Sequence, residues 1–156
     1  MMVPALLASL AETYGQQGHP AEGLTALADA LAFVHRTGAR WDEAELYRLK
    51  GELLLRQSSE NQTASASCFH QAIAIAQNQQ AKSLELRAAM SLARLWQQQG
   101  KPAEAHKLLA PIYGWFTEGF DTPDLQEAKS LLTEEGPRRR TKAIIPAASR
   151  MPIPER

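Results

Sequence analysis

The residues best suited to metal chemistry are four histidines and a single cysteine, Cys68. Cys68 and His70 are two positions apart in sequence, which places them about 200° apart around a helix, so they cannot face one ion. No second histidine stands three or four residues from any of the four, the spacing at which two side chains of one helix bind zinc together. The sequence therefore predicts no metal site and no cofactor.

A second candidate is the Gly-Lys pair that begins at Gly100, because phosphate-binding loops contain such a pair. That motif also needs a glycine five residues earlier and a serine or threonine directly after the lysine, at a turn from strand to helix. Leu95 and Pro102 occupy those two places, and the residues on both sides favour helix. We expect no nucleotide binding.

The neighbouring acids Asp42, Glu43 and Glu45 are candidates for acid–base chemistry. Acids are also favoured in the first turn of a helix, because the helix dipole makes that end partly positive. No serine, cysteine or lysine stands in a recognisable nucleophile motif. The sequence gives no support for catalysis, and we expect the chain not to be an enzyme.

The composition indicates which elements carry these residues. Apolar residues make up 44% of the 156, enough for a core, while aromatic residues make up 6% and Ala, Leu and Gln are abundant. Long stretches lack proline and paired glycines, so helix is favoured over strand throughout. Because there is one cysteine and no pattern typical of a signal peptide or a membrane span, we expect a cytoplasmic all-α protein that contacts no membrane.

One phrase occurs twice with small changes, as QQGHPAEG at residues 16–23 and as QQGKPAEA at residues 98–105. Aligning the two copies also aligns the apolar and small residues around them, and a third, less regular unit lies between, with steps of about 40 residues. Within the phrase, Gly is suited to ending one helix, Pro to starting the next and Glu to its positive end. The phrase is therefore predicted to be a hinge of the scaffold rather than a binding site.

These repeats predict an all-α right-handed solenoid of three antiparallel helix pairs, followed by a capping helix. The repeat domain is expected to span residues 1–135, with its units at about residues 3–37, 42–79 and 81–116. Asp42 and Glu45 have the spacing of a capping box at the start of the second unit.

The capping helix is expected at residues 122–134, with Thr122 as its cap and Pro123 at its first position. Its apolar stripe consists of Leu125, Ala128, Leu131 and Leu132.

Residues 136–156 are expected to form a basic, disordered tail. From Pro137 onward the chain has six Lys or Arg and one acid, which leaves eleven bases and sixteen acids before it. The run PRRRTK lacks interleaved aromatic residues, so it is a weak and unspecific footprint for nucleic acid. We expect no specific nucleic-acid partner.

The offsets of the aligned residues resemble the tetratricopeptide repeat, whose period is about 34 residues. A closer likeness lies in WDEAELYRLKGELLL at residues 41–55 and WFTEGFDTPDLQEAK at residues 115–129. These stretches resemble the C-terminal helical-repeat arm of large bacterial multidomain proteins that carry a predicted signalling ATPase, often with a nucleotide cyclase or a DNA-binding transcriptional regulator domain. The likeness covers roughly residues 5 to 134 and implies an arm that binds, scaffolds or regulates.

The resemblance also implies where a groove lies. In tetratricopeptide stacks, the first helix of each unit lines a concave face, and residues near its small packing residue, here Gly51 or Ala93, point into that face. The groove residues implied for this chain are Glu45, Arg48, Glu52, Arg56, Arg87, Met90, Arg94, Gln97 and Gln98. Alternating acids and arginines suit a charged peptide or a partner helix. The alternative is an exposed face whose charges are solvated and joined by weak local pairs.

The sequence thus predicts a non-catalytic protein-interaction or regulatory module that binds a peptide or helix of a partner protein. Two alternatives stay open. The chain is a truncated remnant of a signalling ATPase arm with no independent function, or it is a structural domain that associates with itself to form a homo-oligomer.

Overall fold

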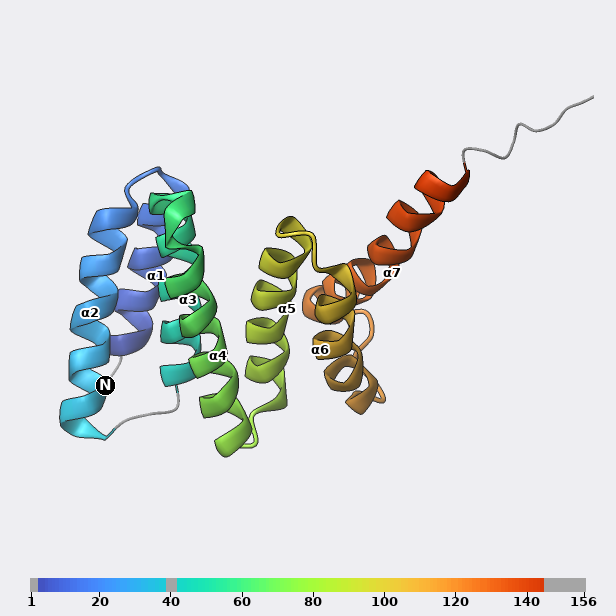
Figure 1. Cartoon of the computed structure of the whole chain (residues 1–156). Helices are drawn as coiled ribbons and strands as arrows, with labels where there is room; N and C mark the ends of the chain where they lie inside the picture. The colour runs from blue at the N-terminus through green and yellow to red at the C-terminus, as the bar shows by residue number, and fades with distance from the viewer. Residues whose placement is uncertain (1–2, 39–41, 145–156) are drawn as a thin grey trace, which may run out of the picture.

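The chain folds into helices (Figure 1). The computed structural model describes the backbone of residues 3–38 and 42–144 and the side chains of residues 8–38 and 42–133. Within these ranges there is no strand, which confirms the predicted all-α class. The elements are α1 (Val3–Gln16), α2 (Pro20–Thr37), α3 (Glu43–Gln57), the 3-10 helix η1 (Ser59–Asn61), α4 (Gln62–Asn78), α5 (Lys82–Gln98), α6 (Pro102–Trp115) and α7 (Pro123–Ile144).

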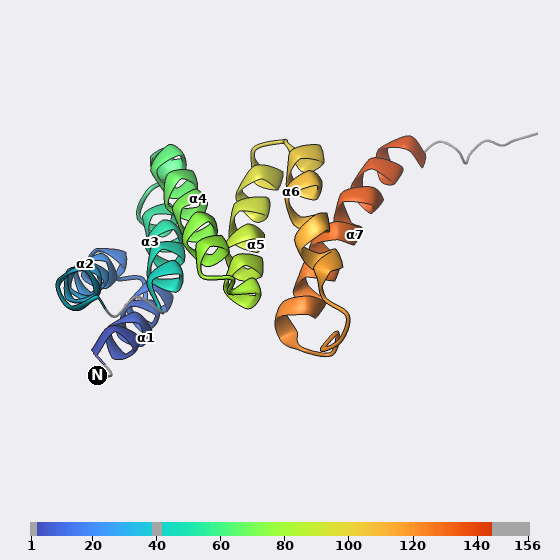
Figure 2. The same cartoon turned by 90° about the horizontal axis from the view of Figure 1, so that it is seen from below.

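The helices lie in a row in which each one packs against the next along the chain (Figure 1, Figure 2). In addition, α1 contacts α3, α3 contacts α5, and α5 contacts α7. These contacts place the odd-numbered helices next to one another, and we call the surface that they share the odd-helix face. The helix boundaries lie close to those expected for the three units and for the start of the last helix.

Three turns between helices pass through a residue with a left-handed backbone and end in the same way. In the repeated phrase this residue is a glycine, Gly18 with φ 83° and Gly100 with φ 81°. After each glycine, the next amide donates to the carbonyl five residues back, the bond of a Schellman ending. The turn from α4 to α5 has the same bond, from the Ala81 amide to the Ala76 carbonyl, but Gln80 takes the left-handed position with φ 57°. The repeated phrase is thus a helix ending and a helix start, as its residues predict.

The longer turn of the second unit is held by two side chains. The Ser58 hydroxyl accepts a hydrogen bond from the Glu60 amide at 3.1 Å, and the Asn61 side-chain amide donates to the Leu54 carbonyl at 3.0 Å. The first bond caps η1 and the second satisfies a carbonyl at the end of α3, so the extra residues form the ordered element η1 between α3 and α4.

Two clusters of buried side chains form the core. One lies among α1, α2 and α3 and contains Leu27, and the other extends from α4 to α7 and contains Phe69. Tyr47 of α3 packs against both clusters. Gly51 lets α3 approach α4 closely, since a Cβ atom there would lie 2.5 Å from the Phe69 ring. The odd-helix face is therefore supported by a core on each side of α3.

The last helix is longer than the one expected at residues 122–134. Its start follows the prediction, because the Thr122 hydroxyl accepts a hydrogen bond from the Leu125 amide at 3.4 Å and the apolar stripe is packed in the second core cluster. The helix then continues to Ile144, because the residues RRRTKA at 138–143 are mostly good helix formers. Residues 136–144 are thus helical rather than disordered, and the rest of the expected tail, 145–156, lies outside the described residues.

Asp42 stands at the N-cap position of α3, but its side chain makes no capping hydrogen bond. The capping box predicted for Asp42 and Glu45 is therefore wrong. The Glu45 carboxylate pairs instead with Arg48 on its own helix and with Arg87 on α5. Two guanidinium groups offer this carboxylate stronger, charge-assisted bonds than one backbone amide does.

Candidate functional site

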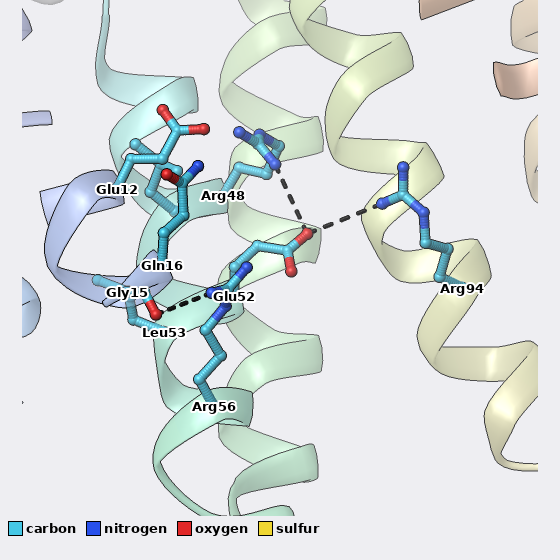
Figure 3. A pocket seen from close by; sticks show the side chains of 9 residues that line it. Glu12, Gly15, Gln16, Arg48, Glu52, Leu53, Arg56 and Arg94 are labelled. Atoms are coloured by element: carbon cyan, nitrogen blue, oxygen red, sulfur yellow. Dashed lines mark hydrogen bonds and ion pairs between the residues drawn. The ribbon is translucent and has the colours of Figure 1, made fainter. Parts of the chain in front are cut away.

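A cleft of about 240 Å³ opens on the odd-helix face between α1 and α3, with α5 at its edge (Figure 3). Its lining residues are Glu12, Gly15 and Gln16 of α1, Arg48, Leu49, Glu52, Leu53 and Arg56 of α3, and Arg94 of α5. Three arginines and two glutamates thus converge from three helices that are far apart in sequence. This convergence makes the cleft the candidate binding site.

Arg48 is held more tightly than the other arginines of the cleft. Its guanidinium makes a two-point contact with Glu45, with Nε 3.0 Å from Oε1 and Nη2 2.6 Å from Oε2. Burial alone would lower the pKa of Arg48, but the hydrogen bond and charge of Glu45, together with the charges of Glu52 and Glu12, outweigh burial and raise it. Arg48 is therefore a fixed positive charge in the wall of the cleft.

Glu52 lies between two arginines, as the dashed lines of Figure 3 show. Its Oε2 atom is 3.5 Å from Nη1 of Arg48 and 3.8 Å from Nη1 of Arg94. The hydroxyl of Ser91, a buried residue of α5, donates to the same oxygen at 2.7 Å. This carboxylate thus ties α3 to α5 and is already occupied by groups of the chain.

Two rows of acid, arginine and acid cross the odd-helix face from α3 through α5 to α7. The first row is Glu45, Arg87 and Asp124, and the second row is Glu52, Arg94 and Glu127. In the first row, the arginine Nη1 is 3.0 Å from the α3 carboxylate and its Nε is 3.6 Å from the α7 carboxylate. Each arginine of α5 is therefore neutralised from both sides.

Arg56 is bound in a different way. Its Nη1 donates to the carbonyl oxygen of Gly15 at 2.9 Å, at the C-terminal end of α1. Among the described residues, no carboxylate forms an ion pair with Arg56, and no basic group forms one with Glu12. Both side chains are exposed. Arg56 and Glu12 are therefore the charged residues of the cleft that form no ion pair with the described residues, although the charge of Glu12 still acts on Arg48.

The structure brings together most of the groove residues expected from the sequence. Six of them form or flank the cleft and the two rows, namely Glu45, Arg48, Glu52, Arg56, Arg87 and Arg94. The side chain of Gln97 donates to the Leu131 carbonyl of α7 at 3.2 Å, and Gln98 is exposed at the end of α5. These residues of α3 and α5 thus lie near one another on the odd-helix face, and their role as a groove stays a prediction.

Met90 does not face the groove, and its assignment is corrected. Its side chain is 2% exposed and belongs to the core cluster from α4 to α7. The next residue, Ser91, is itself buried and donates to Glu52 of α3, and Met90 points about 100° away from it around the helix, into the core.

Sequence reasoning missed the contributions of α1 and α7. Glu12 directly follows Ala11, the small packing residue of the first unit, so the offsets used for α3 and α5 also point to it. The sequence pattern of the last helix indicates no role for Asp124 and Glu127, which lie outside its apolar stripe. Their pairing with α5 depends on how α7 packs, which no local pattern reports.

A second cavity, of about 450 Å³, lies among α4, α5 and α6. Trp115 at its edge is 59% exposed, and the Lys82 ammonium lies 5.7 Å from its ring centroid. Both carboxylate oxygens of Glu85 are engaged, one by Lys82 at 3.1 Å and the other by Gln77 at 3.0 Å. The charges of this cavity satisfy one another, so it is a weaker candidate than the cleft.

The remaining reactive groups offer little chemistry. Burial raises the pKa of the Cys68 thiol, although the charge of Lys50 opposes this shift, so the nucleophilic thiolate is disfavoured. In the part of the chain that the structure describes, no three His, Cys, Asp or Glu side chains are grouped so that they could hold a metal ion. Across the same residues, none of the helices has both the length and the apolar character that a membrane span requires.

No family model matches the chain, and comparisons with curated proteins and with solved structures gave no match. The resemblance to tetratricopeptide repeats and to the arm of signalling ATPases therefore stays an interpretation of the sequence.

Proposed function

We propose that the chain is a non-catalytic interaction module whose odd-helix face binds a short segment of a partner protein, centred on the cleft between α1 and α3. The observation that carries this proposal is the convergence of charged side chains from α1, α3 and α5 on one opening of about 240 Å³. Small-molecule pockets are usually larger, about 300–1,000 Å³. An opening of this size suits one or two side chains of a peptide.

The arrangement of the helices supports the proposal. We interpret the row as a tetratricopeptide-like solenoid in which α1, α3 and α5 line the inner side and α7 covers the last pair. Stacked helix pairs of this kind present extended binding surfaces on a rigid scaffold. A preformed surface costs little to order when a peptide binds.

A structural domain with no ligand of its own is the second candidate, and the two acid–arginine–acid rows favour it. Arg87 and Arg94 are already paired on both sides by side chains of the chain itself. A remnant of a longer repeat arm, or a domain that associates with itself, would present the same rows. The two candidates differ in whether the cleft retains a peptide.

The cleft is tested by selecting a displayed library of random peptides on the purified chain. Gln16→Trp places an indole in the lining of the cleft, whereas Gln17→Trp places the same indole at an exposed position outside that lining. We expect selected peptides to bind the wild type and the Gln17→Trp chain equally, and the Gln16→Trp chain about tenfold more weakly or worse, as measured by fluorescence anisotropy. Failure to enrich any peptide, or equal binding by both variants, refutes binding in the cleft and favours the structural domain.

A further inference from the structure

The charged residues of the cleft fall into two groups, and the first group is self-sufficient. Glu52 is shared by Arg48 and Arg94. Arg48 also pairs with Glu45, and Arg94 also pairs with Glu127. A charged ligand that bound here would have to break existing ion pairs. This part of the cleft is therefore a rigid wall rather than a binding group.

The second group consists of Arg56 and Glu12, which lie at opposite ends of the cleft with Gln16 between them (Figure 3). Neither has an ion-pair partner among the residues that the structure describes. Hydrogen bonds that involve a charged donor or acceptor are about twice as strong as neutral ones. These two side chains are thus the groups of the cleft that gain most from an external charge.

Arg56 is also oriented for such a contact. Its Nη1 atom is fixed on the Gly15 carbonyl at 2.9 Å, which uses one of the five N–H donors of the guanidinium. Because the guanidinium is planar, fixing one nitrogen restricts where the others point. Gly15 lets α1 approach α3 closely at this point, since a Cβ atom there would lie 2.5 Å from the Leu53 side chain, whereas it would lie at an ordinary contact distance, 3.8 Å, from Nη1 of Arg56.

We propose that the cleft binds a single carboxylate of its peptide partner through Arg56, and that Glu12 disfavours a second acid and favours a basic residue beside it. The carboxylate belongs to an Asp or Glu side chain or to the C-terminus of the peptide. This inference rests on the proposed function of the cleft as a peptide site. The expected ligand is therefore a peptide with one acid next to a base, and not a run of acids.

The test selects random peptides in two display formats. In one format the peptide has a free C-terminus, and in the other it is joined at both ends to the displaying protein, so that it has no free C-terminal carboxylate. Anisotropy then measures the binding of selected peptides to the wild type, Arg56→Gln, Arg56→Lys and Glu12→Gln. Arg36→Gln is the matched control, because Arg36 lies on α2 and contacts Phe33 rather than the cleft. Circular dichroism establishes that each variant is folded.

We expect the selected peptides to carry an acid, and Arg56→Gln to weaken their binding about ten- to a hundredfold, with partial rescue by Arg56→Lys and no change in Arg36→Gln. Replacing the acid of the peptide by its amide should weaken binding to the wild type by the same factor, with no further loss for Arg56→Gln. Glu12→Gln should improve the binding of peptides with two adjacent acids. Amidation of the C-terminus distinguishes the two sources of the carboxylate.

Three outcomes overturn the inference. If peptides are selected and excluded by Gln16→Trp, but bind wild type and Arg56→Gln equally, the carboxylate proposal fails while peptide binding in the cleft stands. If no peptide is enriched at all, both proposals fail together. A loss in Arg56→Gln that is equally large for acid and amide peptides would show a structural role for Arg56 and also refute carboxylate binding.

Discussion

At the scale of single residues, Gly51 and Gly114 show how the surroundings of a glycine decide its role. Gly51 of α3 lies against Phe69, and a Cβ atom there would come within 2.5 Å of Cε1 and 2.9 Å of Cδ1 of that buried ring. Gly114, in the last turn of α6, has no neighbouring atom within 4 Å of a built Cβ. Gly51 is therefore required for close helix packing, whereas Gly114 gives α6 no such contact.

We predict opposite effects for the two alanine substitutions. Gly51→Ala should lower the free energy of unfolding by about 1–3 kcal/mol, because the fully buried Phe69 ring has no free space into which to move. Gly114→Ala should raise it by up to about 1 kcal/mol, because alanine favours the helix. Urea denaturation followed by circular dichroism measures both values. Equal effects of the two substitutions would contradict the close approach of α3 and α4.

At the scale of elements, the turns show that one type of helix ending can be formed with different residues at its left-handed position. The turns after α1 and α5 use glycine at the left-handed position, where an L side chain is strained. The turn after α4 has the same Schellman-type hydrogen bond but places Gln80 there. The geometry of the turn is thus conserved within the chain although the residue is not.

Gln80→Gly should stabilise the protein by about 0.5–1 kcal/mol, because the relief of about 1–2 kcal/mol of left-handed strain exceeds the entropy cost of a glycine, about 0.4–1 kcal/mol. Gly100→Gln should destabilise it by a similar amount. Gln79→Gly is the control, because Gln79 has φ −87° and gains nothing from glycine. Thermal unfolding by calorimetry compares the three, and a destabilised Gln80→Gly chain would argue against strain at this turn.

At the scale of the whole molecule, the two core clusters divide the row of helices. The first cluster belongs to α1, α2 and α3, and the second extends from α4 to α7. Contacts run between neighbouring helices and between consecutive odd-numbered helices. Because stability in such an arrangement is a sum over neighbours, one end can open before the other.

We predict that Leu27→Ala, which empties a fully buried site in the first cluster, accelerates amide exchange mainly in α1 and α2. Lowering the free energy of local unfolding by at least about 2 kcal/mol corresponds to about thirtyfold faster exchange in these helices. Leu109→Ala, at a buried site of α6, should show the opposite pattern. Hydrogen exchange with mass spectrometry measures both, and uniform acceleration along the chain would show that the row unfolds as one unit.

The sequence by itself determined the all-α class and most helix ends. Gly18, Gly38 and Gly100 mark the ends of helices, and Pro20, Pro102 and Thr122 mark the starts. These signals work because backbone conformation and capping depend on interactions within a few residues. The same locality made the charged face of α3 and α5 predictable, since helical spacing alone groups Arg48 with Glu52, and Arg87 with Arg94.

Only the tertiary structure decided which charged side chains form ion pairs within the chain and which can pair with a ligand. In the folded chain, α5 is oriented so that Ser91 faces Glu52 and Met90 lies in the core. The acids of α7 lie beside the arginines of α5 and pair with them. It also replaced the capping box of Glu45 by pairs with two arginines. The rotation of a helix about its axis, and the partner of a long charged side chain, depend on packing between distant segments. For that reason the availability of Arg56 and Glu12 could not be deduced from spacing.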